Sequence, residues 1–478
     1  MKSRQTDLTR GNLLRNLIQL ALPIMASNLV QTLYTVTDAF WLGKLAEGAR
    51  GAVSAVGISF PLIFFLQSFG FGFVVSGNSL IAQYKDAGLT ENIKKVTGQY
   101  VLIMVMVATV FLVASLSLLD NILSWLRTPA EILDVTRDYM SIIIPAQVFM
   151  FIVICIQSFY HGVGDTVVPM KIQMISVGIN LVIDPLMIFG IWIFPEMGVL
   201  GAAYATLFAR FIAAVMAVIS LVTVHRELLP SIKDIVPDIK MLKKIIGISI
   251  PASFGQSMTS FGFVVLQGFV NGYGTVVIST HVLSMRIQSL FMMPAMGLST
   301  ALSAIIGQNL GAREVQRAKE SVGVALKLVV SIMAVGGATI FFFGGLIIKV
   351  FIDDPAVIEL GAQVMKITCF TSLIFSIIFV FLGVFNGSGH TKSTMVINIA
   401  RLWAFRIPLV FILSGAVMNF WIFGKSPFEG FFSFLAYPLR ERPFFALWYS
   451  MLISNILSAV WAYMIYRKGK WQKAIIHS

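Results

Sequence analysis

The sequence predicts an all-α polytopic membrane protein with about twelve transmembrane helices in two pseudo-symmetric six-helix lobes. Three observations support this fold class: the composition, the length of the apolar runs and an internal repeat. Of the 478 residues, 57% are hydrophobic and 12% are charged, against about 45–50% and about 25% in a soluble domain. A single soluble core stops growing near about 250–300 residues. The composition therefore excludes a cytosolic enzyme, a disordered chain and a secreted disulfide scaffold.

The cysteines and the net charge agree with a membrane protein. Cys155 and Cys369 both lie in apolar runs, so they form neither a disulfide framework nor a zinc cluster. A net charge of +13 in a soluble protein would suggest binding to nucleic acid. In a membrane protein it more often indicates cytoplasmic loops rich in Lys and Arg. We therefore expect no nucleic-acid partner.

The apolar runs are long enough to cross a membrane as helices. A helix needs about 20 apolar residues to cross the hydrocarbon core. The runs are uninterrupted, which excludes a β-barrel built from short alternating stretches. The expected spans are residues 16–42, 52–82, 97–124, 139–160, 168–192, 198–224, 243–270, 276–308, 322–350, 360–385, 394–422 and 443–466.

The distribution of basic residues predicts the orientation. The first apolar run is too long for the hydrophobic region of a signal peptide, so we expect it to be retained as the first helix. If the spans alternate in direction, most Lys and Arg outside them fall on the side of the N-terminus. Such loops are typically cytoplasmic. The sequence therefore predicts a multi-pass protein of the plasma (inner) membrane with both termini cytoplasmic.

The chain carries an internal repeat. Residues 20–23 (LALP) return as residues 248–251 (ISIP), and residues 160–166 (YHGVGDT) return as residues 385–391 (FNGSGHT). Each half therefore holds about six spans and enters the membrane in the same direction. Halves of this kind are related by an axis along the membrane normal, as in transporters built from parallel repeats.

The join between the halves predicts the domain organisation. It is a charged stretch that contains Pro230 and Pro237, which indicates a cytoplasmic linker. We expect a first lobe over residues 1–225, a linker over 226–244 and a second lobe over 245–478. Two similar bundles that face each other can rock to open a cavity to either side of the membrane, which is the basis of alternating access.

Two carboxylates are expected deep in the membrane. Of the 22 acidic residues, only Asp38 and Asp184 fall away from loops and span ends, both in the outer half of the first lobe. A carboxylate at such depth costs a few kcal/mol on insertion scales, and it usually faces a cavity, binds a cation or takes a proton. The alternative is that each aspartate caps a polar contact in the bundle. On the first helix, Gln31 and Tyr34 share a face with Asp38 because of their spacing.

Polar neighbours complete a predicted cation or proton site. Asn180 and Asp184 are four residues apart and share one face of the fifth span. Thr206 lies about two turns from the outer end of the sixth span. Together with Asp38 they offer hard oxygen ligands for Na⁺, or carboxylates that share a proton. Amides and hydroxyls also often bridge membrane helices, so a structural role for Asn180 and Thr206 stays open.

The second half offers polar residues without a deep carboxylate. Gln256 belongs to a polar stripe on the seventh span, which suits the second-lobe wall of a substrate cavity. Arg406 is expected to lie deep, and no acidic partner falls within a span of this half. We expect it to bind carbonyl groups at a helix end or to line a wet cavity.

Several motifs together resemble the multidrug and toxic compound extrusion (MATE) transporters. The resemblance covers nearly the full chain. It is carried by residues 21–23, 28–34 and 38, 162–166 (GVGDT), 180–185, 198–206 (GVLGAAYAT) and 307–312 (GQNLGA). It implies two six-helix lobes, cation-coupled antiport, and export of amphipathic, often cationic compounds.

Within the family, the chain is similar to the DinF-like branch. That branch uses an aspartate on helix one and an Asn-x-x-x-Asp motif on helix five, which Asp38, Asn180 and Asp184 match. The resemblance carries Thr206 over as a further ligand. It also places Tyr139 and Gln157 at polar positions near the pocket. With Gln31, Tyr34 and Gln256, these residues are the expected substrate contacts.

The expected function is a cation-coupled multidrug efflux antiporter that works by alternating access. The partners are small-molecule drugs, the coupling cation (Na⁺ or H⁺) and membrane lipid, with no other cofactor, and the resemblance implies a monomer. The chain has no ATP-binding P-loop, and we expect no enzyme activity. One alternative is a lipid-linked oligosaccharide flippase of the wider superfamily. Another is a membrane-embedded lipid-modifying enzyme, for which His161 with Asp165 is the nearest candidate pair.

Overall fold

The computed structural model describes residues 8–44, 49–126, 128–415, 439 and 441–477. Over this part of the chain the secondary structure is helical, with no β-strand. Eleven helical segments within it are long and apolar enough to cross a membrane. A further long helix, α9 (Ile239–Asn271), carries polar residues such as Ser253, Gln256 and Thr259 along its length, which lower its hydropathy. The predicted all-α membrane fold is confirmed.

The helices of the first lobe lie close to the expected spans. A short helix, α4 (Leu119–Trp125), continues the third span after a break at Leu118. The long helices are α1 (Leu13–Gly43), α2 (Ala49–Asp86), α3 (Thr90–Ser117), α5 (Leu133–Gly162), α6 (Val167–Ile188) and α7 (Val199–Val224).

The second lobe follows the same plan with one irregular helix. Its regular members are α9, α10 (Thr275–Gly311), α11 (Val315–Lys349), α12 (Pro355–Gly387) and α16 (Ala446–Arg467). The remaining span begins as α13 (Thr391–Ile399), passes through a π-helical turn over Ala400–Arg406 and ends as α14 (Ile407–Leu413). Pro408 has no N–H to donate to the preceding turn, which favours this irregularity. Residues 416–422 of the expected span 394–422 lie outside the described residues.

The first half of α1 packs against the second lobe. Leu17, Leu20 and Ile24 belong to the same buried apolar cluster as Ala295 and Leu298 of α10. The other half of α1 continues along the first lobe beside α6. One helix therefore contacts both lobes, so a change in its path would alter how the lobes fit together.

The lobes meet along α2 in a contact that we call the termini-side seam. It consists of residues 69–86 of α2 against α9, α10 and the end of α12. Several hydrogen bonds link this part of α2 to the second lobe. They join Phe69 to Ser253, Ser76 to Ser249, Asn78 to Ser303, and both Ser79 and Gln83 to Gly387.

Small residues let the backbones approach closely in this seam. Gly307 and Gly311 are four residues apart on α10 and face α2. A Cβ atom at Gly307 would lie 2.7 Å from Cβ of Ala82, and one at Gly311 would lie 2.1 Å from the carbonyl oxygen of Gln83. Glycine pairs at this spacing are typical of tight helix contacts in membranes.

The C-terminal tail covers the same end of the seam. The N–H of Ile475 donates to Oε1 of Gln83 at 3.0 Å, and Nζ of Lys244 lies 3.4 Å from the carbonyl oxygen of Ile475. Trp471 is 1% exposed and stacks on Tyr466. The tail therefore contacts both lobes.

The chain between the lobes is held against α3. Nε2 of Gln99 donates to the carbonyl oxygens of Asp234 and Val236, each at 2.7 Å, and Oε1 accepts from the N–H of Asp238 at 3.0 Å. This part includes the short helix α8 (Ile232–Ile235). The linker and lobe borders proposed from the sequence stay predictions.

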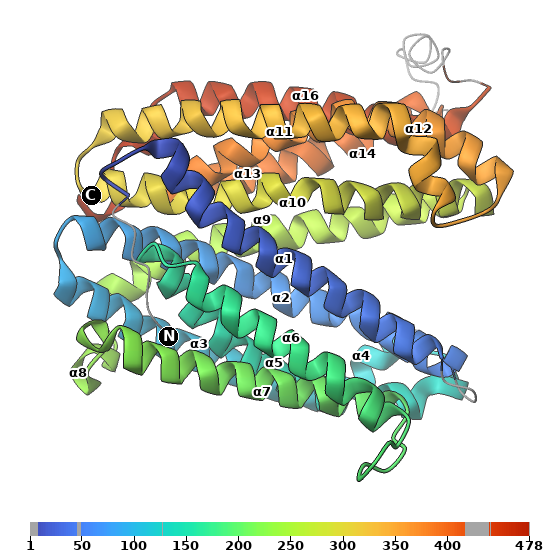
Figure 1. The fold of residues 1–478 in the computed structure, drawn as a ribbon, viewed down its shortest axis with the longest axis horizontal. Helices are drawn as coiled ribbons and strands as arrows, with labels where there is room; N and C mark the ends of the chain where they lie inside the picture. Colours follow the sequence, from blue (N-terminus) through green and yellow to red (C-terminus); the bar gives the residue numbers. More distant parts are fainter. Residues whose placement is uncertain (1–7, 45–48, 127, 416–438, 440, 478) are drawn as a thin grey trace.

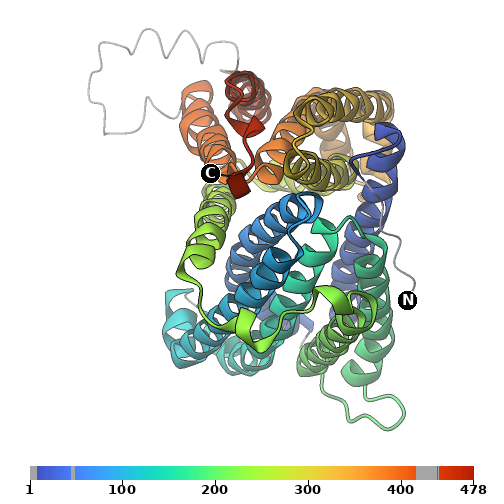
Figure 2. The same cartoon turned by 90° about the vertical axis from the view of Figure 1, so that its left-hand side faces the viewer.

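The lobes are close at one end of the molecule and diverge toward the other. Figure 1 shows them together near the labels N and C, with α1, α6 and α7 running away from α10 and α12 at the opposite end. The end-on view in Figure 2 shows α1, in dark blue, alongside both lobes. The conformation is therefore closed on the side of the termini.

Candidate functional site

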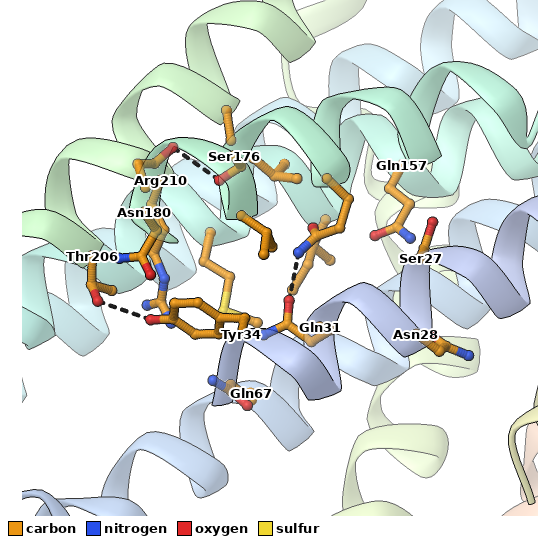
Figure 3. A pocket seen from close by; sticks show the side chains of 17 residues that line it. Ser27, Asn28, Gln31, Tyr34, Gln67, Gln157, Ser176, Asn180, Thr206 and Arg210 are labelled. Carbon is orange, nitrogen blue, oxygen red and sulfur yellow. Dashed lines mark hydrogen bonds between the residues drawn. The ribbon is translucent and has the colours of Figure 1, made fainter. Parts of the chain in front are cut away.

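A cavity of about 270 Å³ lies inside the first lobe, between α1, α2, α5, α6 and α7. Figure 3 shows the side chains that surround it. Its lining is unusually polar for the interior of a membrane bundle, where polar groups normally pair or face water. The polar residues are Ser27, Asn28, Gln31, Tyr34, Gln67, Gln157, Gln173, Ser176, Asn180, Thr206 and Arg210.

Helix α1 supplies one wall and is hydrogen-bonded to the two helices opposite. Gln31 and Tyr34 lie one turn apart and so face the same side. The hydroxyl of Tyr34 lies 2.8 Å from Oγ1 of Thr206 on α7. Nε2 of Gln173 on α6 donates to Oε1 of Gln31 at 2.5 Å. The wall formed by α1 is thus fixed by polar contacts, which a bound ligand or ion can replace.

Three polar groups lie together at one end of the cavity. Asn180, Thr206 and Arg210 surround the ring of Tyr34 in Figure 3. Asn180 and Thr206 are 3% and 4% exposed. Among the described residues, Nδ2 of Asn180 and Nη1 of Arg210 are buried without a hydrogen-bond partner. Buried donors of this kind cost about 1–3 kcal/mol each, so this end of the cavity favours a ligand that accepts hydrogen bonds.

Asp184 lies one turn beyond Asn180 on α6 and is 1% exposed. Asp165 is the other buried carboxylate among the acidic side chains that the structure describes. Oδ1 of Asp165 accepts the N–H groups of Val167 and Val168 at the start of α6, so it caps that helix. Asp184 has no such capping position and lies within the apolar part of the helix. A charge there requires compensation by a cation, a proton or hydrogen bonds.

Asp38 lies on α1 four residues after Tyr34, but its side chain is outside the described part of the structure. The structure brings Tyr34 and Thr206 together at the end of the cavity where Asn180 lies, with Asp184 one turn further along α6. That both aspartates share one ion stays a prediction.

The expected substrate contacts fall into two groups. Gln31, Tyr34 and Gln157 line the cavity. Tyr139 is instead buried in an apolar cluster with Leu42 and Ile188. Gln256 lies in the second lobe, on α9. Neither of these two residues lines the first-lobe cavity.

Gln173 and Arg210 line the cavity but were not among the predicted site residues. Gln173, Ser176 and Asn180 follow a spacing of three and four residues on α6, and Thr206 and Arg210 are four apart on α7. Both spacings put side chains on one helix face. This periodicity was the signal that would have identified Gln173 and Arg210.

The cavity and the buried Asp184 offer several side-chain oxygens. Within the described ranges, no group of three or more His, Cys, Asp or Glu side chains is placed to hold a metal ion. The amide of Asn180 and the hydroxyls of Thr206 and Tyr34 line the cavity. The carboxylate of Asp184 is buried one turn from Asn180 and does not line it. Carboxylate, amide and hydroxyl oxygens are ligands for hard cations. That these oxygens bind a coupling ion stays a prediction.

Two repeated helical lobes, a polar cavity within one lobe and a seam that closes one end define a membrane transporter. The family model MatE matches residues 23–186 and again residues 251–412. The chain belongs to the MatE family. Because the same family model matches both halves, the internal repeat seen in the sequence is confirmed.

Relatives and solved structures agree with this family. The chain is 27% identical over 404 residues to the probable multidrug resistance protein YoeA of Bacillus subtilis, covering 84% of this chain and 87% of that protein. It is 26% identical over 466 residues to the probable multidrug resistance protein NorM of Thermotoga maritima, covering 97% and 94%. Its fold is similar to the outward-facing conformation of a multidrug resistance MATE family transporter, with a TM-score of 0.85, 19% identity and 98% of each chain covered. The assignment to the DinF-like branch stays a prediction.

Proposed function

We propose that this protein is a cation-coupled multidrug efflux antiporter that exports amphipathic, often cationic small molecules by alternating access. The family and the names of its relatives support drug export. The main support for cation coupling is that Asp184 is buried inside the first lobe, close to a polar cavity.

The coupling cation, Na⁺ or H⁺, binds at Asp184 together with Asp38. Asn180 and Thr206 contribute neutral oxygens when the ion is Na⁺. A proton needs only the carboxylates, which share it or take it in turn. Occupancy neutralises the buried charge and changes how α1 packs against α6 and α7.

Arg210 gives a physical reason for competition inside the cavity. Its guanidinium lies at the same end of the cavity as Asn180 and Thr206. A cation bound at the aspartates repels the like-charged guanidinium of Arg210. The polar wall formed by α1 then rearranges, and the hydrogen bond between the Tyr34 hydroxyl and Thr206 breaks. Drug and cation therefore oppose each other, and by linkage each weakens the binding of the other equally.

The closed end of the molecule supports an orientation for this cycle. With both termini cytoplasmic, the termini-side seam closes the inner side, and the conformation faces outward in the plasma membrane. The cation enters from outside, the drug leaves outward, and the seam must then open to load drug from the cytoplasm. The chain acts as a monomer, since each chain carries both lobes.

The lipid-linked oligosaccharide flippase is less well supported. Binding of a pyrophosphate favours several Arg or Lys side chains around one site. The lining of the first-lobe cavity includes one cation, Arg210, and that of a cavity in the second lobe includes two, Arg286 and Arg406, so neither gathers a large cluster of cations. The enzyme alternative is excluded because the family consists of transporters. His161 and Asp165 are both buried, and Asp165 caps α6.

The proposal is tested with purified protein in liposomes loaded with a fluorescent cationic dye. A pH gradient and a Na⁺ gradient are applied separately, and a protonophore or sodium ionophore collapses each in turn. We expect one gradient to drive dye movement and its collapse to stop it. Dye movement that is equal with and without both gradients would refute cation coupling.

A further inference from the structure

A second cavity, of about 490 Å³, lies in the second lobe between α9, α10, α16 and the end of the π-helical turn. These elements meet there near the end of α9 and the beginnings of α10 and α16, which is the end away from the termini. Arg406, His281, Arg286 and Gln267 supply its polar groups. Its apolar walls consist of Phe263, Leu266, Val282, Met285, Leu447 and Met451.

Arg406 is held in place at this cavity by neutral groups. It is 4% exposed. Nε donates to Oγ of Ser454 at 3.2 Å, and Nη2 donates to Oδ1 of Asn455 at 3.1 Å. Asn455 is itself fixed, because its Nδ2 donates to the carbonyl oxygen of Thr371 at 3.3 Å. A guanidinium carries more N–H groups than these two bonds use, so part of its donor capacity remains for a ligand.

The charge of Arg406 has no carboxylate partner in the part of the second lobe that the structure describes. Arg401 is also buried there, with its guanidinium 4.4 Å from the ring centre of Phe375. Ion pairs in the described ranges involve neither arginine. The acidic residues of this lobe that the structure describes stand near helix ends or in the connections beside them, and they are Glu314, Glu320, Asp353, Asp354, Glu359 and Glu441. A buried charge without a counter-charge costs several kcal/mol, so the site favours an anion.

The two lobes differ in the sign of their buried charge. Pro185 follows Asp184 in the first lobe, and the related Pro408 comes two residues after Arg406 in the second. The duplicated fold therefore carries a carboxylate in one copy and a guanidinium near the corresponding position in the other. The second cavity is not a repeat of the cation site.

We propose that the second-lobe cavity binds the anionic head of an amphipathic molecule, with Arg406 as the principal contact. A guanidinium binds a carboxylate or phosphate through paired hydrogen bonds. His281 offers a further polar contact, since its Nδ1 is buried without a hydrogen-bond partner among the described residues. Arg286 is exposed and attracts anions toward the cavity. The apolar walls take up the hydrocarbon part, and the volume is that of an ordinary small-molecule site.

Two sources supply this chemistry: an anionic phospholipid of the surrounding membrane, or a free amphipathic carboxylate. The site stands independently of cation coupling in the first lobe. Its test is therefore a binding measurement with the purified full-length protein in a neutral detergent.

The probe is dansylaminoundecanoic acid, whose dansyl group accepts energy from Trp448, a ring that lies 6.3 Å from His281. The variant Arg406→Gln removes the charge at the cavity. Arg401→Gln is the matched control, because it removes a buried arginine of the same π-helical turn that does not line the cavity. Loss of a hydrogen-bonded charge contact corresponds to a decrease in affinity of about tenfold or more. We expect this decrease for Arg406→Gln and an unchanged affinity for Arg401→Gln.

A second variant keeps the proposal testable if Arg406→Gln unfolds. Met451→Trp fills the cavity without a change in charge, and it should also weaken binding of the probe. Displacement by phosphatidylglycerol but not by decanoate identifies lipid as the ligand, and the reverse result identifies a free carboxylate. The proposal is overturned if Arg406→Gln and Met451→Trp bind the probe as the wild type does. It is equally overturned if the neutral methyl ester of the probe binds as tightly as the acid.

Discussion

Replacing Gly311 with alanine should open the termini-side seam. The added Cβ would lie 2.1 Å from the carbonyl oxygen and 2.8 Å from the carbonyl carbon of Gln83. Both are backbone atoms, so no rotamer change relieves the overlap. An ordinary contact at this point is 3.4–4 Å, and the two helices must separate to reach it. The overlap exists only while α2 and α10 are packed together.

The size of the effect follows from the packing. Overpacking of a tight contact costs about 1–3 kcal/mol. Since about 1.4 kcal/mol is a factor of ten in an equilibrium constant, the ratio of seam-closed to seam-open molecules should fall by about five- to 150-fold. Gly323→Ala is the matched control. It also replaces a helical glycine in the second lobe, on α11, but its Cβ would have no neighbour within 4 Å.

The assay measures the distance between spin labels at Lys95 on α3 and Lys319 on α11, two exposed positions on different lobes. Pulsed electron paramagnetic resonance in detergent and in liposomes gives the distribution of this distance. We expect a longer component to grow in Gly311→Ala and not in Gly323→Ala. Identical distributions in the two variants would show that this seam does not determine the conformation.

Two further outcomes follow from individual contacts. Tyr34→Phe removes the hydrogen bond to Thr206, which contributes about 0.5–1.5 kcal/mol, and it should lower dye affinity by about two- to tenfold in an equilibrium binding assay; unchanged affinity would contradict a role for this wall of the cavity. His390 lies between α12 and α13, where burial lowers its pKa, and Lys470 lowers it further. Because the unfolded chain then binds the proton more readily, the contribution of His390 to the unfolding free energy is complete above about pH 6.5 and falls as the pH decreases below it. Thermal unfolding should show a greater loss of stability on acidification in the wild type than in His390→Gln, and equal losses would refute this explanation.

Hydropathy predicted the spans well because the bilayer sets a minimum length for every crossing helix. The polar stripe of α9 did not prevent its assignment, since the apolar run over residues 243–270 is still long enough to cross the bilayer. The break at Leu118 and the π-helical turn before Arg406 were not predicted, because both depend on local packing rather than on hydropathy.

Part of the cavity lining was predicted from the sequence. Helical spacing identified Gln31, Tyr34 and Asn180, whose side chains do face one cavity. Arg210 was not assigned to it, since hydropathy does not determine the rotation of a helix about its own axis when lipid and protein are both apolar. Tyr139 was expected near the pocket from the family resemblance alone, and it lies in an apolar cluster.

The central claim is that Asp184 links cation binding to drug binding. The most direct test is the dissociation constant of a cationic drug, measured by titration calorimetry over a range of pH and of Na⁺ concentration. Drug affinity should fall as cation occupancy rises in the wild type and in Asp138→Asn, an exposed acid-to-amide control on α5. The same dependence should be absent in Asp184→Asn. An Asp184→Asn protein that retains the full dependence would contradict the claim.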